Sequence, residues 1–183
     1  MLQMTPILAA ILFLAGCGSQ LDTGSASTQD RQSILETIRG GMAAERIAFI
    51  PAPAVCPGPV PATVLEQLVA QAPMALGAYF TSPQLEKEID LVTKVVTDPK
   101  GGPACEYGGG VDWVRLDTVS TNDSSAVAMG QFRAWSRLAQ WQAAGPKMAE
   151  PHNTLDATFN LKRINGRWLI SRYDWSFAPG SEP

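Results

Sequence analysis

The amino-terminal half of the chain places its apolar residues at helical spacing. This pattern predicts a first helix that ends at about Ile50, with a weak point or kink at Gly40-Gly41. Three residues just before the pattern can cap the helix, namely Ser27, Thr28 and Asp30. Its apolar side consists of Ile34, Leu35, Ile38 and Met42.

Two further helices are predicted on either side of Ser82-Pro83. The second helix begins near Ala62 or Thr63, and Pro73 should kink or divide it. Its apolar stripe contains Val64, Leu65, Leu68, Val69, Ala72 and Leu76. The third helix takes Ser82 as its cap and Pro83 in its first turn, and Asp98-Pro99 ends it. Its predicted buried side is Leu85, Ile89, Val92 and Val96.

From Val111 onward the pattern changes to the alternation that is typical of strands. One strand is predicted over residues 111–119 and a longer one over 125–139, separated by the turn cluster Thr121-Asn122-Asp123-Ser124. The glycine-rich segment Lys100 to Gly110 is expected to be a loop or a bulge, and the segment Gln140 to Pro151 is expected to be a loop.

The last strands form a hairpin over Thr154 to Phe177, with Asn165-Gly166 as its two-residue turn. Counting outward from this turn predicts the pairs Leu161–Ile170, Phe159–Arg172 and Ala157–Asp174, which share one face. That face is richer in Leu, Ile and Phe, so we take it as the core side. Tyr173, Trp175 and Leu169 are then expected on the opposite face.

The predicted fold class is therefore α+β, with N-terminal helices packed on a curved antiparallel sheet of about four strands. The 183 residues are enough for one domain with a real core. We place this domain at residues 29–178 and a tail at 179–183.

The start of the chain indicates export. Pro6 to Ala15 is an apolar run of secretory length, too short to span a bilayer. It ends in Leu14-Ala15-Gly16-Cys17, which resembles the lipobox of bacterial lipoproteins, although no Lys or Arg precedes the run. The resemblance implies that residues 1–16 are a signal peptide and that Cys17 carries the lipid, palmitate included, which anchors the protein to the cell membrane or the outer membrane. A plain secretory signal with a coincidental cysteine is the alternative.

Residues 17–28 are small and polar and predict a flexible tether. Beyond Cys17, the remaining cysteines are Cys56 and Cys105. In an oxidising envelope two such cysteines predict one disulfide. A metal-binding or nucleophilic thiol is the weaker alternative, because neither cysteine is in a CxxC pair and the only histidine, His152, is distant in sequence. No cofactor and no metal site are predicted.

The charge distribution argues against nucleic acid as a partner. The net charge is −3, and no cluster of Lys and Arg provides a phosphate-binding surface. The locally basic residues Lys162, Arg163 and Arg167 flank the hairpin turn, where a solvated loop tip is expected.

Val111 to Phe177 resembles the sheet of the nuclear transport factor two-like superfamily. The resemblance is carried by AVAMGQFRAW and by ATFNLKRINGRWLISRYDW, and it covers about two fifths of the chain. It implies a cone-shaped, cystatin-like domain of a superfamily that includes SnoaL-like enzymes and secretion scaffolds. Because this fold carries both enzymes and non-catalytic modules, function has to be argued from the site.

No catalytic motif is present, and the weak candidates for catalysis are Asp174, Arg172 and His152. Arg172 lies two residues from Asp174, which predicts a mutual salt bridge near the sheet rim more than a poised base. The alternative is that both line a wet cavity. Candidate binding residues are Trp135, Trp141, Trp168 and Tyr107, with ordinary core packing as the alternative for the tryptophans.

These observations predict a membrane-anchored envelope lipoprotein with a non-catalytic cone domain that binds an envelope protein or a small hydrophobic ligand. The alternative is a SnoaL-like or ketosteroid isomerase-like lyase or isomerase that acts on a hydrophobic substrate in the cone. The resemblance would also permit a homodimer through the outer sheet face.

Overall fold

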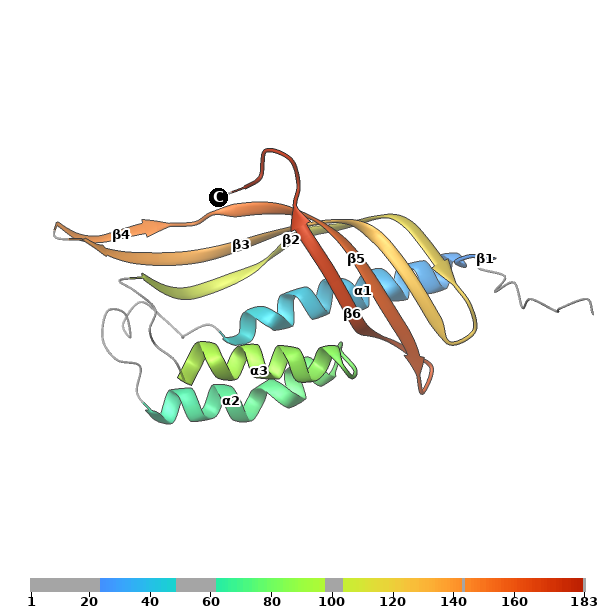
Figure 1. Ribbon diagram of the computed structural model, residues 1–183, viewed down its shortest axis with the longest axis horizontal. Coiled ribbons are helices and arrows are strands. Elements are labelled where there is room, and N and C mark those ends of the chain that lie inside the picture. The colour runs from blue at the N-terminus through green and yellow to red at the C-terminus, as the bar shows by residue number, and fades with distance from the viewer. Residues whose placement is uncertain (1–23, 49–61, 98–103, 143, 183) are drawn as a thin grey trace, which may run out of the picture.

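The computed structural model describes residues 24–48, 62–97, 104–142 and 144–182. Its helices are α1 (Thr28–Ala44), the 3-10 helix η1 (Glu45–Ala48), α2 (Ala62–Gly77) and α3 (Gln84–Thr97). Its strands are β1 (Gly24–Ser25), β2 (Ala104–Thr121), β3 (Ser125–Gln142), β4 (Gly145–Ala149), β5 (His152–Ile164) and β6 (Arg167–Phe177). The α-helices lie on one face of the sheet, as Figure 1 shows, so the predicted α+β class is confirmed.

The sheet is antiparallel, in the order β1-β2-β3-β5-β6, with β4 paired to the far end of β3. Four of these strands are long, as predicted, and β1 and β4 are short additions. Apolar residues on the inner face of the sheet pack against α1 and α3, and α2 packs against α3 and η1. Fully buried members of this core include Ile34, Ile38, Met42, Leu76, Phe80, Phe159, Leu161 and Ile170.

The helices follow the predicted pattern with differences at Gly40-Gly41, at Pro73 and at the start of α3, which begins at Gln84, so that Pro83 precedes its first turn. Ser27 caps α1, because its hydroxyl oxygen accepts a hydrogen bond from the Asp30 amide at 3.0 Å. Helix α1 continues through Gly40-Gly41, where a side chain would clash: a Cβ on Gly41 would lie 2.9 Å from Ile170 Cδ1. Helix α2 likewise contains Pro73 without being divided there. Gly41 therefore allows close packing between α1 and the sheet, and Gly40 makes room for the Tyr79 ring.

Both of these segments contain strands, so the prediction of loops was wrong in part, although the register of β2 shifts between Glu106 and Gly108, within the segment predicted as a loop or bulge. Strand β2 begins at Ala104, and its glycines face β3, where a Cβ on Gly110 would lie 2.8 Å from Trp135 Nε1. Gly110 thus leaves room for the Trp135 ring within the strand. Strand β4 starts at Gly145, whose φ of 116° suits glycine, and pairs back onto β3.

The hairpin register is confirmed as far as Leu161–Ile170 and is wrong beyond that pair. A bulge follows, so Asn160 pairs with Arg172 and Phe159 with Tyr173. As a result Tyr173 points into the core, whereas Arg172 and Asp174 point outward and are exposed.

The bulge occurs where Ile170 is bonded on its other side. The Ile170 amide donates to the Tyr79 carbonyl at 2.8 Å, and its carbonyl accepts from the Thr81 amide at 2.9 Å. The next residue, Ser171, is buried, and its hydroxyl donates to the Asn160 carbonyl at 3.1 Å. The segment between α2 and α3 is therefore bonded to the free edge of β6 beside the bulge.

Candidate functional site

The predicted pair Arg172 and Asp174 lies on the outer face of the sheet. Arg172 Nε is 2.9 Å from Asp174 Oδ2, and the two side chains are 67% and 61% exposed. The predicted salt bridge is confirmed, but its placement on the inner face was wrong. Asp174 does not line the space between helices and sheet.

The other predicted catalytic residue, His152, belongs to a network of charges at the surface. Its Nδ1 lies 2.7 Å from Asp112 Oδ2 and its Nε2 lies 3.4 Å from Glu150 Oε1. Arg133 is 3.5 Å from that Asp112 oxygen, and Arg137 is 2.8 Å from Glu150. Each acid in this network thus has a basic partner.

The binding candidates are separated in space. Trp168 is 2% exposed, and its Nε1 donates to Asp30 Oδ1 at 3.1 Å, so it is a core residue. Trp135 packs beneath Arg137, whose guanidinium carbon is 5.1 Å from the centre of a Trp135 ring. The side chains of Trp141, Tyr107 and Cys105 lie outside the described parts of the chain, as do Cys17 and Cys56.

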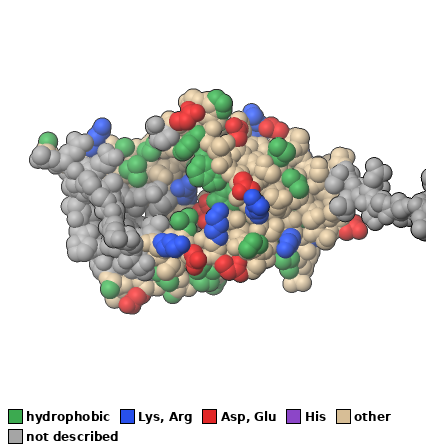
Figure 2. Space-filling model, viewed as in Figure 1, with side chains coloured by type: hydrophobic (Ala, Val, Ile, Leu, Met, Phe, Trp, Pro, Cys, Tyr) green, Lys and Arg blue, Asp and Glu red, His purple; other side chains and the backbone are tan. Residues whose placement is uncertain are grey.

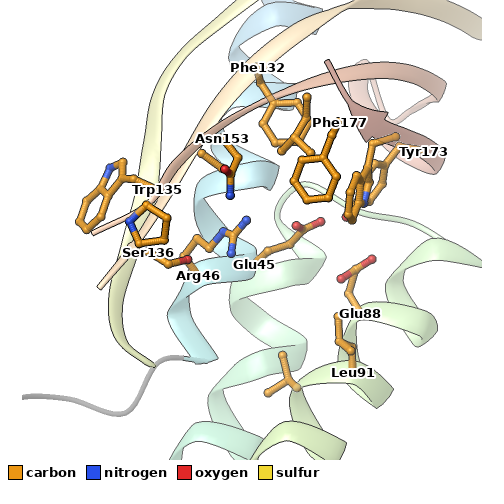
Figure 3. Close-up of a pocket in the computed structure, with 15 residues that line it drawn as sticks. Glu45, Arg46, Glu88, Leu91, Phe132, Trp135, Ser136, Asn153, Tyr173 and Phe177 are labelled. Carbon is orange, nitrogen blue, oxygen red and sulfur yellow. The ribbon is translucent and has the colours of Figure 1, made fainter. Parts of the chain in front are cut away.

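A cavity of about 370 Å³ lies between η1, α3 and the sheet. Figure 3 shows the side chains of Glu45 and Glu88 directed into it from the two helices, with Tyr173, Phe132 and Phe177 on the sheet side. Further lining residues are Arg46, Leu91, Val92, Ala134, Trp135, Ser136, Pro151, Asn153, Leu155 and Trp175.

Glu45 lies immediately after α1, where the chain tightens into η1. The residue as a whole is partly exposed, but its Oε1 atom is buried and has no hydrogen-bond partner among the described residues. Burial raises the pKa of the Glu45 carboxyl to about 8, and the negative charge of Glu88 adds to this increase. A hydrogen bond from the Tyr173 hydroxyl and the charges of Arg46 and Lys87 act in the opposite direction.

Glu88 approaches the same space from α3. It is 3% exposed, and Gln84 Nε2 donates to its Oε1 at 2.5 Å. Burial raises the pKa of Glu88, while the Gln84 hydrogen bond and the charge of Lys87 lower it. Two carboxyl groups from different helices therefore share one poorly solvated space.

Tyr173 provides a neutral donor between these acids. Its ring stacks on Phe159, with centroids 5.7 Å apart, and tilts against Phe80 at 6.4 Å. Burial and the nearby Glu45 and Glu88 charges raise the pKa of the Tyr173 hydroxyl, so it keeps its proton. The bulge in β6 is what turns this hydroxyl toward the cavity.

Sequence reasoning missed Glu45 and Glu88 because both occur in helical segments that were interpreted by their apolar residues. The available signal was Gln84, Glu88 and Val92 at intervals of four, which places two polar side chains on the face that buries Val92. Leu85 and Ile89, predicted to be buried, pack against the core only in part.

An open depression on the outer face contains Asp117, Asp156 and Asp174. Arg115 pairs with Asp117 at 3.2 Å, and Gln131 Nε2 donates to Asp156 Oδ1 at 2.8 Å. Since Asp174 pairs with Arg172, all three acids have partners within the sheet. Acidic, basic and hydrophobic side chains are also interspersed on the face shown in Figure 2.

In the described ranges, no group of three or more His, Cys, Asp and Glu side chains is arranged to hold a metal ion. Within the same ranges, no helix combines the length and apolar character that a membrane crossing requires.

No protein-family model matches the chain, and no curated protein matches it. Among solved structures, the intermembrane space region of the chloroplast protein ARC6 is similar, with a TM-score of 0.52 and 10% identity over 85% of this chain and 100% of that one.

Two further matches have lower scores. A protein of unknown function with a cystatin-like fold from Nostoc punctiforme has a TM-score of 0.40 and 11% identity over 86% of this chain and 97% of that one. An IcmL-like type IV secretion system protein from Legionella pneumophila has a TM-score of 0.41 and 9% identity over 87% of this chain and 98% of that one. At these identities the likeness concerns the fold alone, and the α+β class follows from the helices and the antiparallel sheet described above.

Proposed function

We propose that this chain is an exported, lipid-anchored envelope protein whose domain binds a small molecule in the cavity between η1, α3 and the sheet, without transforming it. The observation that carries the binding role is the buried Glu45 Oε1 atom, which has no hydrogen-bond partner among the described residues. A buried polar atom without a partner costs free energy that a bound ligand can recover. Aromatic walls around a few convergent polar groups are also typical of small-molecule sites.

The proposed anchor rests on the sequence. The apolar run Pro6 to Ala15 and the lipobox-like Leu14-Ala15-Gly16-Cys17 would direct export and lipidation, and residues 17–28 would form the tether. The Cys56–Cys105 disulfide belongs to the same proposal, because it requires an oxidising compartment. In a bacterial host, labelled palmitate should be incorporated into the wild-type chain and be absent from Cys17→Ser. Equal labelling of both proteins would refute the anchor.

The cavity favours binding over acid-base catalysis. A general acid and a general base need surroundings that push their pKa values apart. Here burial raises the pKa of both Glu45 and Glu88, so their surroundings shift the two pKa values in the same direction and not apart.

One observation favours the alternative of a lyase or isomerase. Glu45 and Tyr173 both keep protons near neutral pH and are hydrogen-bonded to each other. Glu45, which accepts a hydrogen bond from Tyr173, could donate its own carboxyl proton to a carbonyl oxygen of a hydrophobic substrate. In that case the reaction would involve the cavity, and neither Asp174 nor His152 would contribute.

A thermal-shift screen of the full chain in detergent tests the binding role. A library of small hydrophobic compounds should contain members that raise the unfolding temperature of wild type but have a reduced effect on Glu45→Gln. Glu66→Gln, which changes an exposed acid on α2, is the matched control and should respond like wild type. A library without effect, or with the same effect on all three proteins, would refute the binding site. Turnover of a hit, detected by mass spectrometry, would favour the enzyme.

A further inference from the structure

Building on the proposed binding function, we infer that the cavity selects a small organic cation, an amine with an apolar body, and that Glu45 and Glu88 supply its counter-charge. Three features of the described residues lead to this inference: the charges in the lining, the aromatic walls and the hydrogen bonds that are already made.

The lining contains more acidic than basic groups. Its charged residues are Glu45, Arg46 and Glu88. With both carboxyls ionised, these residues carry one more negative than positive charge, and a single bound cation would balance it. An anionic ligand would instead bring negative charge into a space where burial already disfavours the ionised forms of Glu45 and Glu88.

The hydrogen-bond positions point to a donor as the ligand's polar end. Glu88 Oε1 already accepts from Gln84, and Glu45 accepts from Tyr173. The remaining buried acceptor is Glu45 Oε1. An ammonium group, which has donors and no acceptor, can bond this atom and supply charge at the same time.

The opposite wall suits the rest of such a ligand. Phe132, Tyr173, Trp175 and Phe177 contribute aromatic rings to the lining. Trp175 is half exposed and packs edge-on against Phe177, with centroids 5.6 Å apart, so it borders the opening. Aromatic faces attract cations as well as apolar groups. A ligand with an apolar body and a cationic head therefore matches both walls.

Binding of a cation should release a proton. The charged and titratable groups that face Glu45 are Glu88 and Lys87 from α3, Arg46 from η1 and Tyr173 from β6. At pH 7 the unliganded Glu45 carboxyl holds a proton, and an ammonium beside it would favour the ionised form. A neutral ligand would leave that proton in place.

Calorimetry with three matched probes tests the inference on the full chain in detergent. The probes are 2-phenylethylamine, the neutral 2-phenylethanol and the anionic phenylacetate. At pH 7 the amine should bind at least about tenfold more tightly than the alcohol, and phenylacetate should bind most weakly. Titrations in two buffers of different ionisation enthalpy should show protons released with the amine and none with the alcohol.

Variants then test whether Glu45 and Glu88 produce the preference for the amine over the alcohol. Glu45→Gln should abolish the proton release and reduce the preference for the amine, and Glu88→Gln should reduce that preference independently. Glu66→Gln should leave both unchanged. Because the comparison of amine with alcohol uses wild-type protein, it does not depend on how the variants fold.

The outcomes separate the two proposals. Equal binding of alcohol and amine, with a Glu45-dependent response in the library screen, would refute the amine and keep the cavity as a binding site. Tighter binding of phenylacetate would also refute it. If none of the three probes binds, the amine inference fails, and a silent library would remove the binding function as well.

Discussion

Glu45 and Asp174 lie on opposite faces of the sheet near β6, and they differ in burial and in the groups that contact them. Asp174 lies on the outer face of β6 and is paired with Arg172 at 2.9 Å in an exposed position. Glu45 lies under the inner face, with a buried oxygen and the Tyr173 hydroxyl as a partner. Tyr173 and Asp174 are neighbours in the chain, yet one lines the cavity and the other faces solvent.

The difference shows that the environment, more than the presence of a carboxylate, decides its role. Water and ions screen the Arg172–Asp174 pair, so it contributes little to stability or chemistry. Around Glu45 the same screening is weak, and the carboxyl group holds its proton up to about pH 8. Glu45 can therefore lose its proton when a cationic ligand binds beside it.

The largest effect is expected when the support of Tyr173 is removed. Phe159→Ala deletes the buried ring that stacks on Tyr173 at 5.7 Å and leaves a void in the core. Such truncations cost about 3–5 kcal/mol of unfolding free energy, measured by urea denaturation. Val127→Ala, on the exposed face of β3, is the control and should have a small effect. A loss from Phe159→Ala as small as that of the control would contradict the assigned core.

The second prediction concerns the proton on Glu45. Its pKa is raised from 4.5 in the unfolded chain to about 8 in the fold, so between these values the folded state binds the extra proton. Stability should therefore fall as pH rises from about 4.5 to about 8, and then level off. Glu45→Gln removes this contribution, and by pH 8 it should be more stable than wild type by on the order of a few kcal/mol.

The measurement is the difference in unfolding free energy between Glu45→Gln and wild type from pH 4.5 to 9. Taking the difference cancels the titration of groups that the two proteins share. Glu66→Gln, measured in the same way, should show no comparable rise with pH. A flat difference curve for Glu45→Gln would mean that Glu45 is ionised throughout and that the contrast with Asp174 does not exist.

Much of the fold could be predicted from the sequence because its signals are local. The Asn165-Gly166 turn, the Ser27 cap and the helical spacing of Ile34, Ile38 and Met42 each depend on residues close in the chain, and each is confirmed. The register of the hairpin was correct wherever β5 and β6 alone determine it.

The site could not be predicted because it depends on contacts between distant segments. The bulge after Ile170 accompanies hydrogen bonds to Tyr79 and Thr81, about ninety positions earlier in the chain. Compared with the predicted register, it reverses the faces of the later residues in β6. Because of this one bulge, Tyr173 lines the cavity, whereas the predicted register had placed Asp174 on that face. The same limit explains why glycines next to Trp135 were taken for a loop.

The third prediction tests whether the two buried acids interact. Glu88→Gln removes a negative charge that raises the pKa of Glu45, so Glu45 should ionise at a lower pH than in wild type. In Glu88→Gln the pH-dependent loss of stability should begin earlier and end earlier, with a change of roughly 1 kcal/mol near pH 8. The pH midpoint of Glu45 ionisation is measured by comparing the double variant Glu45→Gln/Glu88→Gln with the single variant Glu88→Gln. A midpoint that does not move would show that the carboxyls titrate independently.

The smallest effect is expected at the exposed pair. Asp174→Asn removes one partner of an ion pair whose side chains are both more than half exposed, so solvent already provides most of the stabilisation. Asp174→Asn should shift the unfolding midpoint no more than another surface substitution does. The small shift should vanish at high salt. Affinity for 2-phenylethylamine should be unchanged, because Asp174 does not line the cavity. A loss of binding in Asp174→Asn, with stability unchanged, would place the ligand on the outer face and reverse the comparison with Glu45.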